Sequence, residues 1–578
     1  MTLPVLSRSA IREQSWSALV DLLVFSIVLA AIFGVLAVGR YWLGAVTPAA
    51  QISHSPSALP KYAFYSLVRM TVAYFLSLGF AVGYGYIAAY TPRVEAVMIA
   101  ALDILQSIPV LSFLPGVMLA MAALFPSRQL GLELGSIVLI FTGQVWNMAF
   151  SFYSSLKSIP RELREAADIY RFDRWQRFLE LELPYATIGL VWNSIVSVAS
   201  GWFFLMACEM FVLRNHDFRL PGLGSYLQTA ASNDDTGAIV WGLAAMIAVI
   251  TLIDQIVWRP LIAWSDRFKF EQVESSNKVT SPILHLLLSS RAFHWVSAHA
   301  VQPAWNRLTA HAAGLTPRPP KPPRAPSSRA AAWVVPTAGV ALLLLAAYAL
   351  FQAALALKGV TLAELLSTMT AAGATFVRVI VALLIASLWT IPAGVAIGFN
   401  RKLARIAQPL AQIAASVPAT ALFPVVLLLL VRIGGGLSVG AVVLMLLGTQ
   451  WYILFNVIAG AMAIPTELRE AASVFRFNRR QRWTTVILPG IFPYLVTGLV
   501  TASGGAWNAS IVAEYVHFRK ETLSTLGLGA QITAASEAGN FSVLLLSTIV
   551  MAVLVVCINR LVWRPMYRLA ETRYRLEA

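Results

Sequence analysis

Charged residues are scarce in this sequence, and so is cysteine. Only 12% of the 578 residues are charged, whereas 58% are hydrophobic. An ordinary soluble domain has about 25% charged residues, so a soluble globular protein is excluded. The two cysteines, Cys208 and Cys557, lie near or inside apolar stretches. They exclude a disulfide framework and a cysteine metal site, and we expect both to pack as small apolar side chains.

The sequence also lacks a GxxxxGK[ST] phosphate loop, so the chain carries no ATPase of its own. Its seven histidines fall mostly outside the apolar stretches. No nucleophile with a paired base, and no set of metal ligands, is therefore expected at membrane depth. An intramembrane enzyme is the least favoured class, and we expect no catalytic residue, no metal and no cofactor.

Long apolar runs dominate what is present. A run of about 20 apolar residues crosses a bilayer as a helix. Twelve such runs predict twelve spans, at about 18–42, 64–90, 95–124, 134–156, 186–212, 237–259, 333–356, 371–399, 404–431, 437–460, 491–513 and 541–563. The predicted fold class is an all-α polytopic membrane protein of two tandem six-helix units.

A polar segment between apolar runs occurs twice. Residues 159–184 and 464–489 are identical at 15 of 26 positions, at a constant offset of 305. This repeat predicts a duplication with both halves in the same membrane orientation. The predicted organisation is an N-terminal lead (1–17), a first unit (18–260), a basic, proline-rich linker (261–331), a second unit (332–565) and a tail (566–578).

Upstream of the repeated segment the offset is 309. Pro109 and Pro115 match Pro418 and Pro424 at this offset, so we expect kinks in the third span of each half. Either the freed carbonyls line a cavity or the kinks only shape the packing.

Basic residues gather on one side of the twelve-span arrangement, which predicts that the lead, the linker and the tail are cytoplasmic. Within the linker, 281–312 suits a helix on the membrane surface or a tether without a specific role.

Each repeated segment predicts a helix, a sharp turn and a second, capped helix. Pro160 and Pro465 suit the first turn of a helix, where the missing N–H costs nothing. Asp173 and Asn478 each stand three residues before a glutamine, the spacing of a capping box. The first helix has an apolar stripe, which consists of Leu163, Ala166, Ala167 and Tyr170 in one copy and Leu468, Ala471, Ala472 and Phe475 in the other. A hairpin that merely connects two spans is the alternative.

The Glu-Ala-Ala pattern, followed by a turn and Leu-Pro, resembles the EAA loop of the permease subunits of ABC importers. The resemblance implies that each loop is a coupling helix that docks into one of two separate ATP-binding cassette subunits. The implied docking residues are Glu162, Leu163, Glu165, Ala166, Ala167, Tyr170, Arg171, Glu467, Leu468, Glu470, Ala471, Ala472, Phe475 and Arg476.

The chain departs from this family at one position of each loop. The family usually has glycine six residues after the glutamate, where this chain has Arg171 and Arg476. Glycine there permits a left-handed backbone, which arginine disfavours. We therefore expect the turn nearby, at Asp173 and Asn478.

Polar residues inside the predicted spans mark the interior, because lipid-facing polar groups are costly. The candidates for a translocation pathway are Arg69, Gln144, Asn147, Asn193, Ser197, Arg378, Gln450, Thr501 and Asn508. Each of them alone also suits a hydrogen bond between helices. Arg69 and Arg378 would suit an anion as charge partners.

Glu209 and Glu514 each precede a Gly-Leu-Gly turn, formed around Gly222 and Gly224 and around Gly527 and Gly529. Residues 200–232 and 505–537 resemble the permeases of the nitrate, sulfonate, taurine and bicarbonate importers. This resemblance implies a bacterial inner-membrane protein that moves a small anion delivered by a periplasmic or lipid-anchored binding protein. We expect the glutamates to hold the outer loops or to face that protein. The alternatives are an importer of another solute, such as thiamine or iron, and an ATP-independent transporter or channel.

Overall fold

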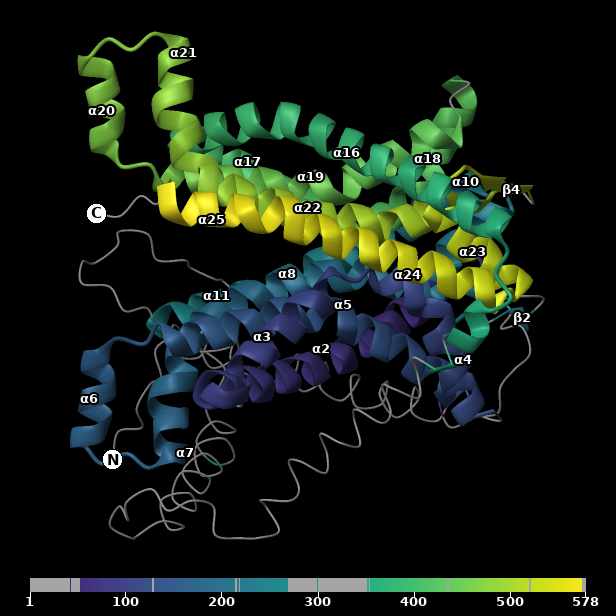
Figure 1. The fold of residues 1–578 in the computed structure, drawn as a ribbon, viewed down its shortest axis with the longest axis horizontal. Coiled ribbons are helices and arrows are strands. Elements are labelled where there is room, and N and C mark those ends of the chain that lie inside the picture. The colour runs from purple at the N-terminus through teal and green to yellow at the C-terminus, as the bar shows by residue number, and fades with distance from the viewer. Residues whose placement is uncertain are drawn as a thin grey trace, which may run out of the picture.

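The computed structural model describes residues 42, 52–126, 129–213, 216–217, 219–268, 299, 351–352, 354–433, 436–518 and 521–573. The described chain forms two halves of equivalent helices that lie against each other (Figure 1). The first predicted span of each half, 18–42 and 333–356, lies almost entirely outside the described residues, as does most of the linker.

The helices of the first half follow one another along the chain. They are α2 (Leu59–Tyr90), α3 (Pro92–Ser107), α4 (Leu114–Leu124), α5 (Leu130–Lys157), α6 (Arg161–Ile169), α7 (Arg174–Arg177), α8 (Leu183–Glu209), α9 (Leu223–Ser232), α10 (Thr236–Ile253) and α11 (Arg259–Ser265). Strands β1 (Val212–Leu213) and β2 (His216–Asp217) form a short antiparallel hairpin between α8 and α9.

The second half repeats this order. Its helices are α16 (Leu362–Phe399), α17 (Arg401–Ser416), α18 (Ala419–Ile433), α19 (Leu437–Ala463), α20 (Thr466–Val474), α21 (Arg479–Gln481), α22 (Leu488–Ala513), α23 (Leu528–Ala538), α24 (Phe541–Ile558) and α25 (Arg564–Arg573). Strands β3 (Tyr515–Phe518) and β4 (Glu521–Ser524) pair between α22 and α23.

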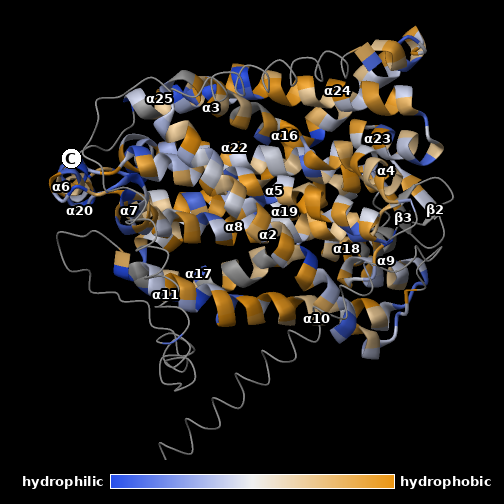
Figure 2. Ribbon diagram, turned by 90° about the horizontal axis from the view of Figure 1, so that it is seen from below, coloured by the Kyte–Doolittle hydropathy of each residue, from blue (hydrophilic) through white to orange (hydrophobic). Residues whose placement is uncertain are grey.

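Eight helical stretches of the described chain are long and apolar enough to cross a membrane. They are Pro56–Tyr90, Leu130–Lys157, Arg174–Glu209, Thr236–Ser265, Leu362–Phe399, Leu437–Ala463, Arg479–Ala513 and Phe541–Ala570. Apolar residues cover most of these helices, and polar residues gather at α6 and α20 (Figure 2). The all-α polytopic fold is therefore confirmed, while the count of twelve spans stays a prediction.

The predicted spans 95–124 and 404–431 are broken rather than merely kinked. In the first half, α3 ends at Ser107 and a 3₁₀ turn (Val110–Phe113) leads into α4. Ile108 is extended because it precedes Pro109, and Val417 is extended before Pro418 in the same way. Backbone groups at the first break bond to the other half: Leu111 N donates to Asn508 Oδ1 at 3.4 Å, and Ser112 O accepts from Thr548 Oγ1 at 3.2 Å.

The core of each half is a row of three long helices, α2–α5–α8 and α16–α19–α22. Small residues let these helices approach closely. A Cβ added to Gly85 would lie 2.9 Å from Phe152 Cδ1, and one added to its counterpart Gly394 would lie 2.7 Å from Val457 Cγ1. The broken helices then pack across to the opposite half, α18 against α8 and the turn at Val110–Phe113 against α22.

Candidate functional site

Two polar hairpins project from one end of the helix bundle. The first consists of α6, a turn and α7, and the second consists of α20, a turn and α21 (Figure 1). Both predicted capping boxes are confirmed. Asp173 Oδ1 accepts from Gln176 N at 2.7 Å and Asn478 Oδ1 accepts from Gln481 N at 2.8 Å, while each glutamine side chain accepts from the backbone N–H of the capping residue.

The expected position of the turn is wrong. Arg171 and Arg476 themselves adopt the left-handed backbone, with φ of 54° and 50°, whereas Asp173 and Asn478 are extended. In the first hairpin, Phe172 N donates to Ala167 O at 2.9 Å and Arg171 N donates to Asp168 O at 3.0 Å. The second hairpin repeats this pair of bonds, which define a Schellman motif. The left-handed position cannot move to Asp173 because the capping box requires an extended residue there.

The apolar stripe of each hairpin divides into a covered part and an open part. Ala167 and Ala472 are buried, whereas Tyr170 and Phe475 are 76% and 72% exposed. Next to them, Ile169 and Val474 are both 78% exposed, and sequence reasoning did not select these two. The predicted glutamates and arginines are also exposed: Glu162, Glu165, Arg171, Glu467, Glu470 and Arg476. Each hairpin thus presents an apolar tip surrounded by charge, which is typical of a protein interface.

At the opposite end of the bundle, Arg69 lies in a buried ion cluster that we call the first outer clamp. Its guanidinium donates to Glu133 Oε2 at 2.5 Å and Oε1 at 2.7 Å, to Glu209 Oε1 at 2.8 Å and to Pro221 O at 2.9 Å. Ser66 Oγ also donates to Glu209 Oε1, at 2.6 Å. None of the three charged side chains is exposed.

Arg378 occupies the matching second outer clamp. Its Nη1 donates to Glu514 Oε1 at 2.8 Å and to Leu526 O at 2.7 Å. Its Nη2 donates to Ser438 Oγ at 2.8 Å and to Thr525 Oγ1 at 2.9 Å. Ser438 stands where the first half has Glu133, at the offset of 305, so the second clamp has one carboxylate instead of two.

The two clamp glutamates, Glu209 and Glu514, hold the Gly-Leu-Gly turns of the outer loops. Of the two roles expected for them, holding the outer loops or facing a binding protein, the structure shows the first. Gly224 N donates to Glu209 Oε2 at 2.8 Å and Gly529 N donates to Glu514 Oε2 at 2.9 Å. A Cβ on Gly222 would lie 2.2 Å from the Glu209 carboxylate, so this close approach requires glycine. Both glutamates have no exposed surface, so in this conformation neither faces a partner protein. Glu133 was not predicted as a site residue, although a glutamate at the edge of an apolar run indicates that a buried charge partner lies nearby.

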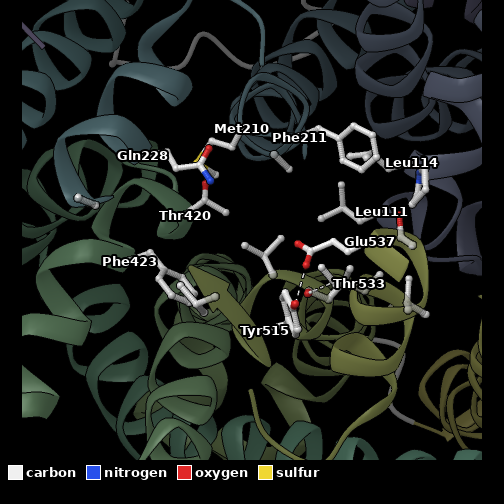
Figure 3. Close-up of a pocket in the computed structure, with 18 of the residues that line it drawn as sticks. Leu111, Leu114, Met210, Phe211, Gln228, Thr420, Phe423, Tyr515, Thr533 and Glu537 are labelled. Atoms are coloured by element: carbon white, nitrogen blue, oxygen red, sulfur yellow. Dashed lines mark hydrogen bonds between the residues drawn. The ribbon is translucent and has the colours of Figure 1, made fainter. Parts of the chain in front are cut away.

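A cavity of about 170 Å³ lies between the two halves, at the end of the bundle that carries the clamps. Its lining is largely apolar and comes from the 3₁₀ turn Val110–Phe113, from α4, α8, α9, α18, α22 and α23, from strand β3, and from Met210 and Phe211, which follow α8. The polar side chains among the lining residues are Gln228, Thr420, Tyr515, Thr533, Ser536 and Glu537 (Figure 3).

None of the nine predicted pathway residues lines this cavity. Several make contacts within or between helices instead: Gln144 Nε2 contacts Met70 Sδ at 3.0 Å, and Gln450 Oε1 accepts from Trp389 Nε1 at 3.1 Å. Asn193, Thr501 and Asn508 bond to carbonyls one turn earlier in their own helices. Ser197 is buried, and Asn147 is half-buried on α5. Arg69 and Arg378 are neutralised by the clamp glutamates, so here neither is the free charge that an anion would need.

Comparison with known proteins agrees with this arrangement. Residues 81–258 and 390–571 each match the family of binding-protein-dependent transport system inner membrane components. The chain belongs to this family. The two matches cover equivalent parts of the two halves, so the predicted duplication is confirmed and the chain is a fused permease. This family consists of multi-pass transport subunits of the inner membrane rather than enzymes.

Individual relatives are similar over about a third of this chain. The chain is 28% identical over 189 residues to the bicarbonate transport system permease of Synechococcus elongatus and to the nitrate import permease of Leptolyngbya laminosa, and 28% identical over 181 residues to the taurine transport system permease of Escherichia coli. These alignments cover 33%, 33% and 31% of this chain and 65%, 64% and 62% of the relatives. The chain thus spans just under two thirds of these relatives' length.

Proposed function

We propose that this permease is the transmembrane part of an ATP-driven ABC importer that moves a small anionic solute. The observation that carries the proposal is the pair of projecting hairpins, which have the same capping boxes and the same left-handed turns in both halves. A loop that only connects two spans has no need of an apolar tip such as Ile169 and Tyr170. The names of the relatives support bicarbonate, nitrate or a sulfonate such as taurine as the class of solute.

The expected partners are two ATP-binding cassette subunits and one solute-binding protein. Each hairpin would dock into one ATPase subunit through its exposed tip and through Glu165 or Glu470. The binding protein would dock at the opposite end, where the strand hairpins β1–β2 and β3–β4 lie (Figure 1). The basic residues of the hairpins favour the cytoplasmic side, so both termini would also be cytoplasmic.

The hairpins would couple ATP binding to movement of the spans. Each is stiffened by a Schellman turn and a capping box, and each continues through a π-helical segment, Phe178–Glu182 or Arg482–Ile487, into the long helix α8 or α22. Moving a two-state transporter from 1:99 to 99:1 takes about 5.5 kcal/mol of differential binding. A rigid connection from the docking surface into the span is suited to transmit that free energy.

Charge reversal in the hairpins tests this function. In the double variant Glu165→Lys/Glu470→Lys, we expect loss of co-purification with the ATPase subunits and loss of hydrolysis stimulated by the loaded binding protein. Both glutamates are exposed, so the thermal stability of the permease alone should not change. Glu180→Lys, an exposed glutamate of the same segment outside α6, is the matched control. Normal coupling in the double variant, or solute uptake without the ATPases, would refute the proposal.

A further inference from the structure

Each docking helix, α6 or α20, is attached to the bundle by a side chain as well as by the chain itself. In the first half, α6 follows α5 after only three residues, 158–160. Arg164 on α6 bridges this joint, because its Nη2 donates to Leu156 O at 2.7 Å and to Lys157 O at 3.4 Å. Both carbonyls belong to the last turn of α5, and the end of a helix favours a cation. The arginine therefore fixes the angle between α5 and α6.

The other two long helices of the first half also end at Arg164. Tyr90, the last residue of α2, donates its Oη to Glu182 Oε1 at 2.6 Å, and Glu182 directly precedes α8. The charge of Arg164 acts on both of these side chains, so the three lie close together. Arg164 Nε and Glu182 Oε2 are buried and have no other partner among the described residues. Their opposite charges attract each other in this dry environment and hold the arginine against the helix ends.

In the second half, the equivalent arginine is attached by different chemistry. Arg469 on α20 is the counterpart of Arg164 at the offset of 305, and its Cζ lies 4.4 Å from the centre of the Phe399 ring. This is the geometry of a cation–π contact. Phe399 is the last residue of α16 and the counterpart of Tyr90 at the offset of 309. Ile487 stands where the first half has Glu182, so the ring replaces the carboxylate as the partner of the arginine.

These contacts reach a helix that the chain does not connect to the docking helix. The chain joins α6 to α5 and, through α7, to α8, and it joins α20 to α19 and α22 in the same way. The ends of α2 and α16 are joined to the docking helices only across space, at Tyr90 and Phe399. With this contact, a displaced docking helix moves three long helices together, whereas without it α2 or α16 follows only through side-chain packing.

We propose that Arg164 and Arg469 are positioning residues that fix each docking helix to the ends of the three long helices behind it. Each row, α2–α5–α8 or α16–α19–α22, then moves as one body when the ATPase subunits close. The inference rests on the proposed import function and adds residues that transmit the motion within the permease. Glu165 and Glu470, in contrast, belong to the surface that would meet the ATPase.

Distances at the far end of the bundle test this role. Spin labels at Lys61→Cys and Ala363→Cys mark exposed positions near the starts of α2 and α16, and Cys557→Ser removes the exposed native cysteine. Pulsed electron paramagnetic resonance measures the distance between the labels in the complex with the ATPase subunits and the binding protein, before and after addition of ATP and orthovanadate. The complex with unchanged arginines should show a shift. Arg164→Gln/Arg469→Gln should retain the ATPase subunits and ATP hydrolysis but lose the shift.

A matched pair of variants separates this role from direct contact with the ATPase. Phe399→Leu leaves both arginines in place but removes the ring, so the shift should become smaller. Phe399→Tyr keeps a ring for Arg469 and should keep the full shift. Arg161→Gln removes an exposed positive charge from the same helix, α6, and should change neither the shift nor the retention of the ATPase subunits.

Three outcomes would overturn the inference. The first is an unchanged shift in Arg164→Gln/Arg469→Gln, and the second is the same shift in Phe399→Leu and Phe399→Tyr. The third is loss of the ATPase subunits from the double arginine variant while Arg161→Gln retains them, which would place the arginines in the docking surface. If the double variant does not fold, the Phe399 pair decides. If the complex with unchanged arginines neither retains ATPase subunits nor shows a shift, the import function itself fails.

Discussion

The two outer clamps have the same framework and different charges. In both, an arginine bonds to a glutamate and to the carbonyl before a Gly-Leu turn, at Pro221 or Leu526. Arg69 has a second carboxylate, Glu133, and no exposed surface, whereas Arg378 has Ser438 instead and an 11% exposed side chain. The framework that fixes the turn is thus retained in both halves, while the charge around it varies.

The hairpins at the other end of the bundle show the opposite behaviour. Their left-handed arginines differ by only 4° in φ, 54° against 50°, and their capping boxes use equivalent atoms. The hairpins thus have nearly the same geometry in both halves, whereas the clamps differ in their charged residues, with Glu133 in one and Ser438 in the other.

Removing the clamp arginines should have the largest effect. Arg69→Met leaves two carboxylates buried without their cation, and we expect the free energy of unfolding to fall by about 3–5 kcal/mol. Arg378→Met leaves one carboxylate that keeps its bonds from Thr375 Oγ1 and Gly529 N, so a loss of about 1–3 kcal/mol is expected. Thermal unfolding of the two detergent-solubilised variants measures the difference.

A second substitution checks that charge causes this difference. Adding Glu133→Gln to Arg69→Met removes one of the uncompensated carboxylates and should recover part of the lost stability. If the double variant is no more stable than Arg69→Met, or if both arginine variants lose the same stability, the clamps do not differ in the way described.

Exchanging the residue that distinguishes the clamps should have an intermediate effect. Glu133→Ser removes two charge-assisted hydrogen bonds from Arg69 but leaves Glu209 in place, so we expect a loss of about 1–3 kcal/mol. Ser438→Glu should change stability by less than about 1 kcal/mol, because Arg378 already has Glu514 as its charge partner and position 438 is exposed, where an added ion pair contributes little. Equal effects in the two unfolding curves would show that position 133 and position 438 have the same role.

Replacing the left-handed arginines with glycine should have the smallest effect on stability, and the effect should be the same in both halves. Arg171→Gly and Arg476→Gly remove a backbone cost of about 1–2 kcal/mol, partly offset by the greater freedom of glycine in the unfolded chain. Each should stabilise its hairpin by up to about 1 kcal/mol, seen as slower amide exchange in α6 or α20. Asp173→Ala, which removes the cap, should accelerate exchange instead. Faster exchange in Arg171→Gly would mean that the arginine side chain, and not the backbone, fixes the turn.

Local patterns in the sequence determined the class of protein, the duplication and the hairpins. The constant offset of 305 is read by comparing the sequence with itself, and the length of an apolar run follows from the thickness of the bilayer. The Asp-x-x-Gln and Asn-x-x-Gln spacings express hydrogen bonds between residues close in the chain. The two family matches confirmed the duplication, and the structure confirmed both capping boxes. The left-handed arginines were mispredicted because the backbone preference of one residue was weighed without the two hydrogen bonds that override it.

Only the tertiary structure decided which polar residues meet. Arg69 and Glu209 are 140 positions apart, and nothing local indicates that they neutralise each other within one clamp. Likewise, the cavity brings Gln228 together with Thr420 and Glu537 from the other half, whereas Gln144 and Thr501, which were selected from the spans, contact a neighbouring helix and their own helix. Such pairings depend on how helices distant in sequence pack, and a hydropathy pattern gives only the face of each helix, not its neighbour.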